Sequence, residues 1–137
     1  MVVMDKKIEV IISCIDYRFW PEALSIFEKN FGRFDVIEMA GGSKNIASPM
    51  HQFDQQAILE NIKVSIDLHQ AKVIILTNHI DCGAYGGSKK FDTMKEEVAF
   101  HKKELKKAKE ICQRKFPNLA VKTFLLTRDN HNKVKIL

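Results

Sequence analysis

Two short motifs, far apart along the chain, carry the side chains best suited to bind a metal ion. The first contains Cys14. The second contains His79 and Cys82, which lie in the turn after a run of valine, isoleucine and leucine. A tight turn can direct both side chains of a His-x-x-Cys motif at one ion, and this spacing is common among zinc ligands. The motif alone is a weak signal, but a third soft ligand after another strand strengthens it. The sequence therefore predicts a zinc site made of Cys14, His79 and Cys82.

Three protein ligands leave the fourth position of tetrahedral zinc free, which is typical of catalytic sites. Asp81, inside the second motif, is therefore expected to be a turn residue rather than a fourth ligand. Water in the open position becomes a source of hydroxide near neutral pH. Because two thiolates formally cancel the charge of the ion, we expect this water to be less acidic than at a three-histidine site. Activity should then rise into the alkaline range.

A carboxylate and a guanidinium follow the first cysteine at intervals of two residues. In an extended segment such residues share a face, so Cys14, Asp16 and Arg18 are predicted to point the same way. Arg18 can hold Asp16 ionised through paired hydrogen bonds. Asp16 can then accept a hydrogen bond from a metal hydroxide, or alternatively swing onto the metal and close the site. The competing interpretation is a surface ion pair of little energetic value.

The elements that position these residues alternate between strand and helix. Strands are predicted over 7–13, 34–39, 120–127 and a central run that starts at Lys72, and helices over 21–31, 48–69 and 92–116. This alternation predicts a three-layer α/β fold with about four parallel strands flanked by helices. Residues 133–137 are a candidate antiparallel edge strand. Ligands of such sheets gather where the winding reverses, so Cys14 and the second motif meet if their strands are neighbours.

The two motifs together resemble the signature of the β-class carbonic anhydrases. Cys14-x-Asp16-x-Arg18 followed by His79-x-x-Cys82 and a glycine is similar in particular to short members with Asp-Cys-Gly in the second motif. The resemblance implies zinc held by the two cysteines and the histidine, an Asp16–Arg18 dyad beside it, and reversible hydration of carbon dioxide to bicarbonate. It also implies a parallel sheet with one antiparallel edge strand, and a homodimer or larger homo-oligomer with the site near the subunit interface.

Three features depart from the family pattern. Residues 38–42 read Glu-Met-Ala-Gly-Gly instead of Arg-Asn-Ala-Gly-Asn, Asn78 replaces the glycine before the motif histidine, and the chain is too short for the helical arm of many relatives. The ligands and the dyad are kept. Glycine allows the backbone to approach a ligand closely, so Gly41, Gly42 and Gly83 are expected to line the substrate pocket.

The remaining cysteine and histidines lack a partner at ligand spacing. Cys112 belongs to an apolar stripe of the last helix, which also includes Met94, and is expected in the core. His69, His101 and His131 are expected to be structural or solvent-exposed. His51 follows the glycine turn and is a candidate proton shuttle.

Composition indicates one soluble domain over residues 1–137, with 45% hydrophobic and 28% charged residues. No apolar run approaches the roughly 20 residues that span a bilayer, and residues 1–7 do not resemble the start of a secretory signal. We therefore expect a cytoplasmic protein with reduced cysteines. Much of the net charge of +5 lies in one lysine-rich helical segment, read as a solvated face, so no nucleic-acid or membrane partner is expected.

Several functions compete. The first is a zinc enzyme that hydrates carbon dioxide. The second uses the same chemistry on carbon disulfide or carbonyl sulfide, because the altered glycine loop can reshape the pocket. The third is a non-catalytic zinc-binding protein, with Asp16 permanently on the metal. A nucleic-acid role rests on net charge alone and ranks below these, and a fold with two buried cysteines and no metal remains an alternative.

Overall fold

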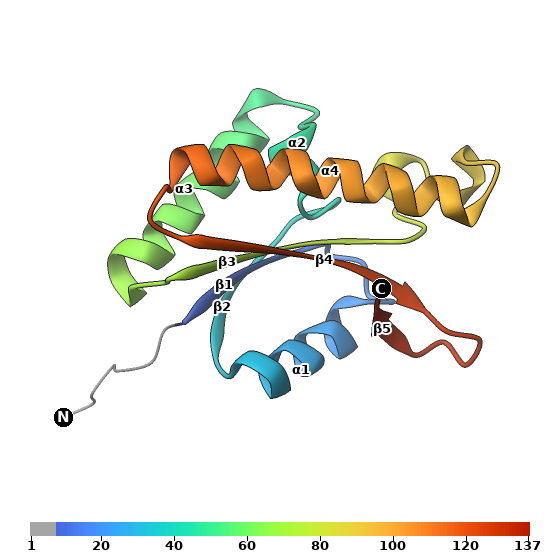
Figure 1. Cartoon of the computed structure of the whole chain (residues 1–137), viewed down its shortest axis with the longest axis horizontal. Coiled ribbons are helices and arrows are strands. Elements are labelled where there is room, and N and C mark those ends of the chain that lie inside the picture. Colours follow the sequence, from blue (N-terminus) through green and yellow to red (C-terminus); the bar gives the residue numbers. More distant parts are fainter. Residues whose placement is uncertain (1–7) are drawn as a thin grey trace.

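A computed structural model describes residues 8–137, so the predicted start of the first strand at Lys7 lies outside the described residues. Within them, the strands form one five-stranded sheet in the order β2-β1-β3-β4-β5 (Figure 1). The first four strands run parallel and β5 runs antiparallel to β4, which confirms the predicted mixed sheet. The elements in chain order are β1 (Glu9–Ser13), α1 (Trp20–Phe31), β2 (Phe34–Glu38), α2 (Lys44–Ala47), α3 (Gln52–His69), β3 (Val73–His79), η1 (Gly83–Tyr85), η2 (Ser88–Lys90), α4 (Met94–Lys115), β4 (Ala120–Arg128) and β5 (Val134–Ile136).

Helices cover both faces of the sheet. Helix α1 lies on one face, and α2, α3 and α4 lie on the other (Figure 1). Successive side chains of a strand alternate between faces. Accordingly, Val10 and Ile12 of β1 belong to the core beneath α3 and α4, whereas Ile11 packs with Phe27 in the core beside α1. Burial on both faces explains why the central strands β1 and β3 read as largely apolar runs.

The helices on the second face begin later than the sequence predicted. Ser48 does not cap α3, because its N–H bonds to the carbonyl of Lys44 and closes the short helix α2, which the sequence analysis missed. Helix α3 therefore begins at Gln52. Helix α4 begins at Met94 because the side chain of Thr93 accepts a hydrogen bond from the Glu96 N–H. Met94 itself is 55% exposed, so its predicted place in the apolar stripe is wrong.

Strands β1 and β3 lie side by side at the centre of the sheet. Ile12 pairs with Leu76, so both strands end at the same carboxyl edge. From β1 the chain goes to β2 on one side and then to β3 on the other, which makes the gap between β1 and β3 the point where the winding reverses. Cys14 follows β1 and His79 ends β3. The fold therefore brings the two motifs to one crevice.

Among the residues that the structure describes, no helix has the length and apolar character needed to cross a membrane.

Candidate metal centre

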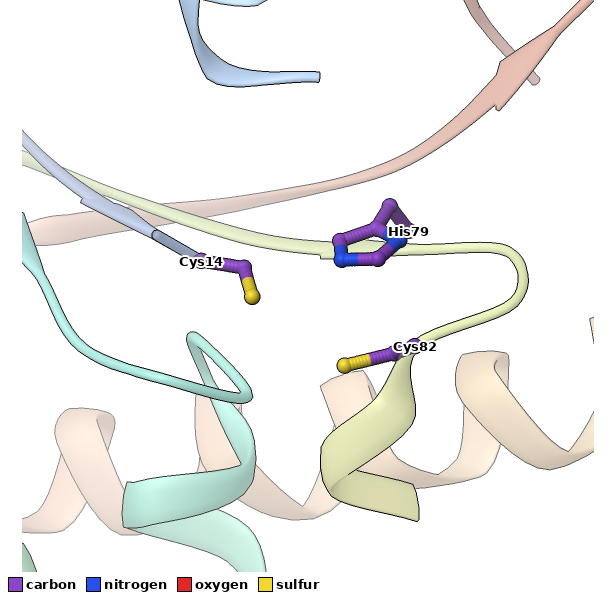
Figure 2. A group of neighbouring side chains, drawn as sticks. All are labelled: Cys14, His79 and Cys82. Carbon is purple, nitrogen blue, oxygen red and sulfur yellow. The ribbon is translucent and has the colours of Figure 1, made fainter. Parts of the chain in front are cut away.

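Cys14, His79 and Cys82 converge at the carboxyl edge of the sheet. Their potential ligand atoms all lie within 4.8 Å of one another, and all three residues are buried. Figure 2 shows the two sulfur atoms and the edge of the imidazole directed at a common space. Cys14 comes from the end of β1, His79 from the end of β3, and Cys82 immediately precedes η1. The structure thus brings together the three side chains that the sequence singled out.

Two contacts orient the imidazole of His79. Its Nδ1 lies 2.8 Å from the carbonyl oxygen of Ile80, so Nδ1 donates a hydrogen there and Nε2 keeps a free lone pair. The ring also stacks on Phe19. Nε2 is buried and has no hydrogen-bond partner among the described residues. Because a buried polar atom rarely lacks a partner, an oriented and unpartnered Nε2 beside two sulfurs fits a metal ligand.

The pKa values of the two cysteine thiols are shifted in opposite directions. The pKa of Cys14 is lowered, first because the Cys82 thiol hydrogen-bonds to it and further because the Gly41 N–H does so. The Gly41 nitrogen lies 3.3 Å from the Cys14 sulfur. The pKa of Cys82 is raised, first by the same hydrogen bond to Cys14 and then by burial. Both cysteines are outside any disulfide, so a divalent cation that binds here displaces whatever protons the two sulfurs carry.

Asp16 and Arg18 form a close pair beside this group. Arg18 Nη2 lies 2.7 Å from Asp16 Oδ2, and its Nε lies 3.1 and 3.2 Å from the two carboxylate oxygens. The guanidinium holds the pKa of Asp16 below its ordinary value, so the carboxylate is ionised. Asp16 Oδ2 also lies 3.6 Å from Nε2 of His79. The carboxylate therefore borders the centre while it remains bound to Arg18.

The pairing of Arg18 with Asp16 arises from a turn rather than from the extended strand that the sequence analysis assumed. Strand β1 ends at Ser13, and the N–H groups of Phe19 and Trp20 both bond to the carbonyl of Asp16. The backbone N–H of Arg18 also bonds to the Asp16 carboxylate. This local turn, and not alternation along a strand, brings the guanidinium back to the carboxylate.

Arg18 has a second carboxylate partner, which the sequence analysis missed. Its Nη1 donates to Asp81 Oδ2 at 2.9 Å, and its Nη2 donates to the Asp81 carbonyl at 2.9 Å. Asp81 is a turn residue, as predicted, and has a φ of 61° in the left-handed region. Aspartate tolerates the left-handed region better than most residues do, so an aspartate between His79 and Cys82 was a sequence signal for a tight turn there. The guanidinium is thus fixed between two carboxylates.

An open cavity of about 440 Å³ borders the centre. Gly41 and Gly83 line it, but Gly42 does not. Gly42 has a φ of 53°, and a Cβ there would lie 2.9 Å from the Thr77 carbonyl oxygen, so its role is close packing between strand ends. The other lining residues are Cys14, Ile15, Asp16, Tyr17, Arg18, Ala40, Cys82 and Ala84.

The histidines outside the centre differ in their surroundings. His51 is exposed, stacks on Phe53 and does not line the cavity, so its position does not support the predicted proton-shuttle role. His101 is fully buried, with Asn78 Nδ2 3.3 Å from its Nδ1 and Glu97 Oε2 3.6 Å from its Nε2. The sequence analysis missed both of these partners.

Comparison with known sequences identifies one family. The family described as "Putative carbonic anhydrase" matches residues 4–135. An uncharacterized protein of Rickettsia conorii is 32% identical over 126 residues, which cover 88% of this chain and 67% of that protein. An uncharacterized protein of Rickettsia bellii is also 32% identical over 126 residues, covering 88% of this chain and 76% of its own length.

Comparison with solved structures identifies the same fold. A carbonic anhydrase from Glaciozyma antarctica has a TM-score of 0.61 at 15% identity, over 93% of this chain and 80% of its own. A tetrameric β-carbonic anhydrase from Sordaria macrospora has a TM-score of 0.60 at 15% identity, with coverages of 96% and 80%. A β-carbonic anhydrase from Trichomonas vaginalis has a TM-score of 0.60 at 17% identity, with coverages of 99% and 86%.

Proposed function

The chain belongs to the family described as "Putative carbonic anhydrase", and we propose that it is a zinc enzyme that catalyses the reversible hydration of carbon dioxide to bicarbonate. One observation carries this proposal: Nε2 of His79 is buried without a hydrogen-bond partner among residues 8–137, within 4.8 Å of the sulfurs of Cys14 and Cys82. The group borders a cavity that is open to a small substrate.

The donor set fits zinc. Two thiols and one imidazole are ligands that zinc prefers, and three ligands are typical of a catalytic site. When bound, zinc would acidify water at its fourth position, which is how this ion supplies hydroxide near neutral pH. The Gly41 N–H at the Cys14 sulfur and the Ile80 carbonyl at Nδ1 of His79 are the supporting contacts that hold such ligands in place.

Asp16 and Arg18 supply the orienting groups. The ionised carboxylate of Asp16 is an acceptor only, and its Oδ2, 3.6 Å from Nε2 of His79, would accept a hydrogen bond from water held at the centre. Arg18 keeps the carboxylate charged and in place. Asp16, Gly41 and Gly83 line the same cavity, whose volume of about 440 Å³ is ample for carbon dioxide.

The same proposal includes a homodimer or larger assembly. Ile15 and Tyr17, which line the cavity, are 56% and 81% exposed, and such apolar side chains at a site suit coverage by a second subunit. The Sordaria macrospora protein of this fold is tetrameric. A reducing compartment such as the cytoplasm suits a centre that requires two free thiols.

The test is a carbon dioxide hydration assay on zinc-loaded protein of measured metal content. We expect about one zinc per chain and a clear acceleration of the pH change when carbon dioxide-saturated water is mixed with buffer. One bound zinc without acceleration would contradict the proposal. Release of hydrogen sulfide from carbon disulfide or carbonyl sulfide would then indicate the sulfur analogue as substrate, and inactivity in both assays would indicate a non-catalytic zinc protein.

A further inference from the structure

Helix α4 carries a buried carboxylate that none of the roles described above uses. Glu97 is only 2% exposed. Its Oε2 accepts the N–H of Asp81 at 2.7 Å, and its Oε1 accepts the hydroxyl of Ser88 at 2.6 Å. Nε2 of His101, one helical turn away, lies 3.6 Å from Oε2. Burial of a carboxylate is costly unless it is well bonded, so the contacts that Glu97 makes indicate what it stabilises.

Those contacts fix the loop that carries Cys82. Glu97 binds the loop at Asp81, just before the cysteine, and at Ser88, six residues after it. The loop is also closed internally, because the Ser88 N–H donates to Asp81 Oδ1 at 2.8 Å. One carboxylate on a long helix therefore holds both ends of a ligand loop.

The same loop determines where Arg18 lies. Asp81 accepts two hydrogen bonds from the guanidinium, one at its side chain and one at its carbonyl. Two further donors of Arg18, its Nε–H and one Nη2–H, bind Asp16. A continuous series of charge-assisted hydrogen bonds thus runs from Glu97 through Asp81 and Arg18 to Asp16, which is the residue that borders His79.

We propose that Glu97 is a positioning residue, which fixes the turn at Asp81 so that Arg18 is held between two carboxylates and Asp16 stays beside the candidate metal centre. The consequence for catalysis rests on the proposed function, but the positioning of Arg18 does not. In a variant that loosens the turn, Arg18 loses its fixed partner at Asp81 and its bond to Asp16 opens more often.

Variants of Glu97 separate hydrogen bonding from charge. Glu97→Gln keeps an acceptor for the Asp81 N–H, and its amide can donate to the Ser88 hydroxyl, so the turn should be preserved. Glu97→Met is of similar length and removes both bonds. Ser88→Ala removes one of the two bonds and provides a milder test if Glu97→Met does not fold.

Glu104 supplies a matched control on the same helix. It accepts the hydroxyls of Tyr85 at 2.8 Å and Ser48 at 3.0 Å, so it links α4 to η1 and to the end of α2. These bonds equal those of Glu97 in number, although both donors are hydroxyls, and they do not involve Asp81 or Arg18. Glu104→Met should therefore lower stability without loosening the guanidinium.

The readout is hydrogen exchange at Nε–H of Arg18, measured by nitrogen-15 NMR on zinc-loaded protein. The chain has four arginines, and Arg18→Lys identifies the resonance by its loss. We expect Glu97→Met to accelerate this exchange by about tenfold or more, and Ser88→Ala to accelerate it less. The loss of hydrogen bonds to a charged group corresponds to a change in an equilibrium of about this size. Glu97→Gln and Glu104→Met should stay within about twofold of the native rate.

Two results would overturn the proposal. The first is that the Nε–H of Arg18 exchanges as slowly in Glu97→Met as in the native protein. If Glu97→Met is unfolded, the same result in Ser88→Ala would overturn the proposal. The other is equal acceleration by Glu104→Met, which would mean that the effect reflects general destabilisation. If the native protein does not hydrate carbon dioxide but the exchange pattern holds, the proposed function fails and the positioning role stands.

Discussion

The ring of Phe19 lies almost flat against the imidazole of His79, with their centroids 4.1 Å apart and their planes 21° from parallel. Phe19 is 4% exposed and belongs to the core on the α1 face of the sheet. The imidazole is restrained a second time by the bond from its Nδ1 to the Ile80 carbonyl. The stack and this bond together set the direction of Nε2, so the core on the α1 face helps to orient the candidate ligand.

Loss of the stack should therefore weaken zinc binding. We expect Phe19→Leu to lower zinc affinity by about tenfold, because the loss of a group that orients a metal ligand weakens metal binding by about this factor. Competition titrations with a chromogenic chelator measure the affinity. Phe27→Leu is the matched control, because Phe27 is buried in the same core but packs on Phe31 and Phe124. Equal affinities of the two variants would show that the stack does not orient His79.

The three cysteines provide a second prediction. Cys14→Ala and Cys82→Ala each remove a ligand, so each should leave well below one zinc per chain after gel filtration in dilute chelator. Cys112 is fully buried on α4, where burial raises the pKa of its thiol to about 12, and it lies in the core as predicted. Cys112→Ala should lower stability but keep one zinc. Loss of zinc from Cys112→Ala alone, with the other two variants loaded, would contradict the assignment.

Much of this centre was predictable because its ligands follow strands that are evident from their apolar runs. The runs before Cys14 and His79 predict parallel strands, and parallel strands end at one edge of a sheet. The sequence did not establish that β1 and β3 are neighbours, because the order of strands depends on packing between distant segments. The turn that begins at Asp16 was missed for a local reason, since extended geometry was assumed beyond Ser13.

Asp16 yields a prediction about activity. Because its carboxylate is the acceptor beside the centre, Asp16→Asn should lower kcat for carbon dioxide hydration by roughly a hundredfold, the scale of a lost proton acceptor. Zinc content should stay at one per chain. Asp67→Asn, which removes only an exposed ion pair with Lys63, should leave both quantities unchanged. Full activity in Asp16→Asn would exclude the role proposed for this carboxylate.

A pH-dependent contribution to stability is expected at Asp35, on strand β2. Its Oδ2 accepts the Ser65 hydroxyl at 2.6 Å and lies 2.7 Å from Nδ1 of His69. Burial opposes ionisation, but these bonds outweigh it, so the pKa of Asp35 lies below its ordinary value of 3.8. A lowered pKa in the folded state means that the contribution is fully present above 3.8 and is lost as the pH falls through the lower, folded value.

Urea unfolding of Asp35→Asn and the native protein at pH 6 and at pH 3 tests this linkage. The free energy of unfolding should differ by about 1 kcal/mol at pH 6, and the difference should shrink at pH 3. The comparison between two proteins at each pH cancels acid effects on the metal centre. A difference that grows as the pH falls would have the wrong sign for a lowered pKa.

The features that the sequence did not reveal depend on contacts between segments far apart. Glu97 sits in a helix rich in lysine, where a carboxylate is normally solvated, but here the 81–88 loop packs onto α4 and bonds to it. The four-residue helix α2 is too short to leave a periodic pattern. It is held in part by the Asn45 amide, which donates to the carbonyls of Ala40 and Gly42.

X-ray absorption spectroscopy at the zinc edge of the loaded protein tests the central claim most directly. The account predicts two sulfur ligands at about 2.3 Å and two nitrogen or oxygen ligands at about 2.0 Å around one zinc per chain. The fit should lose one sulfur in Cys14→Ala or in Cys82→Ala. A native spectrum without sulfur ligands would show that the metal lies elsewhere and would contradict a centre built from Cys14, His79 and Cys82.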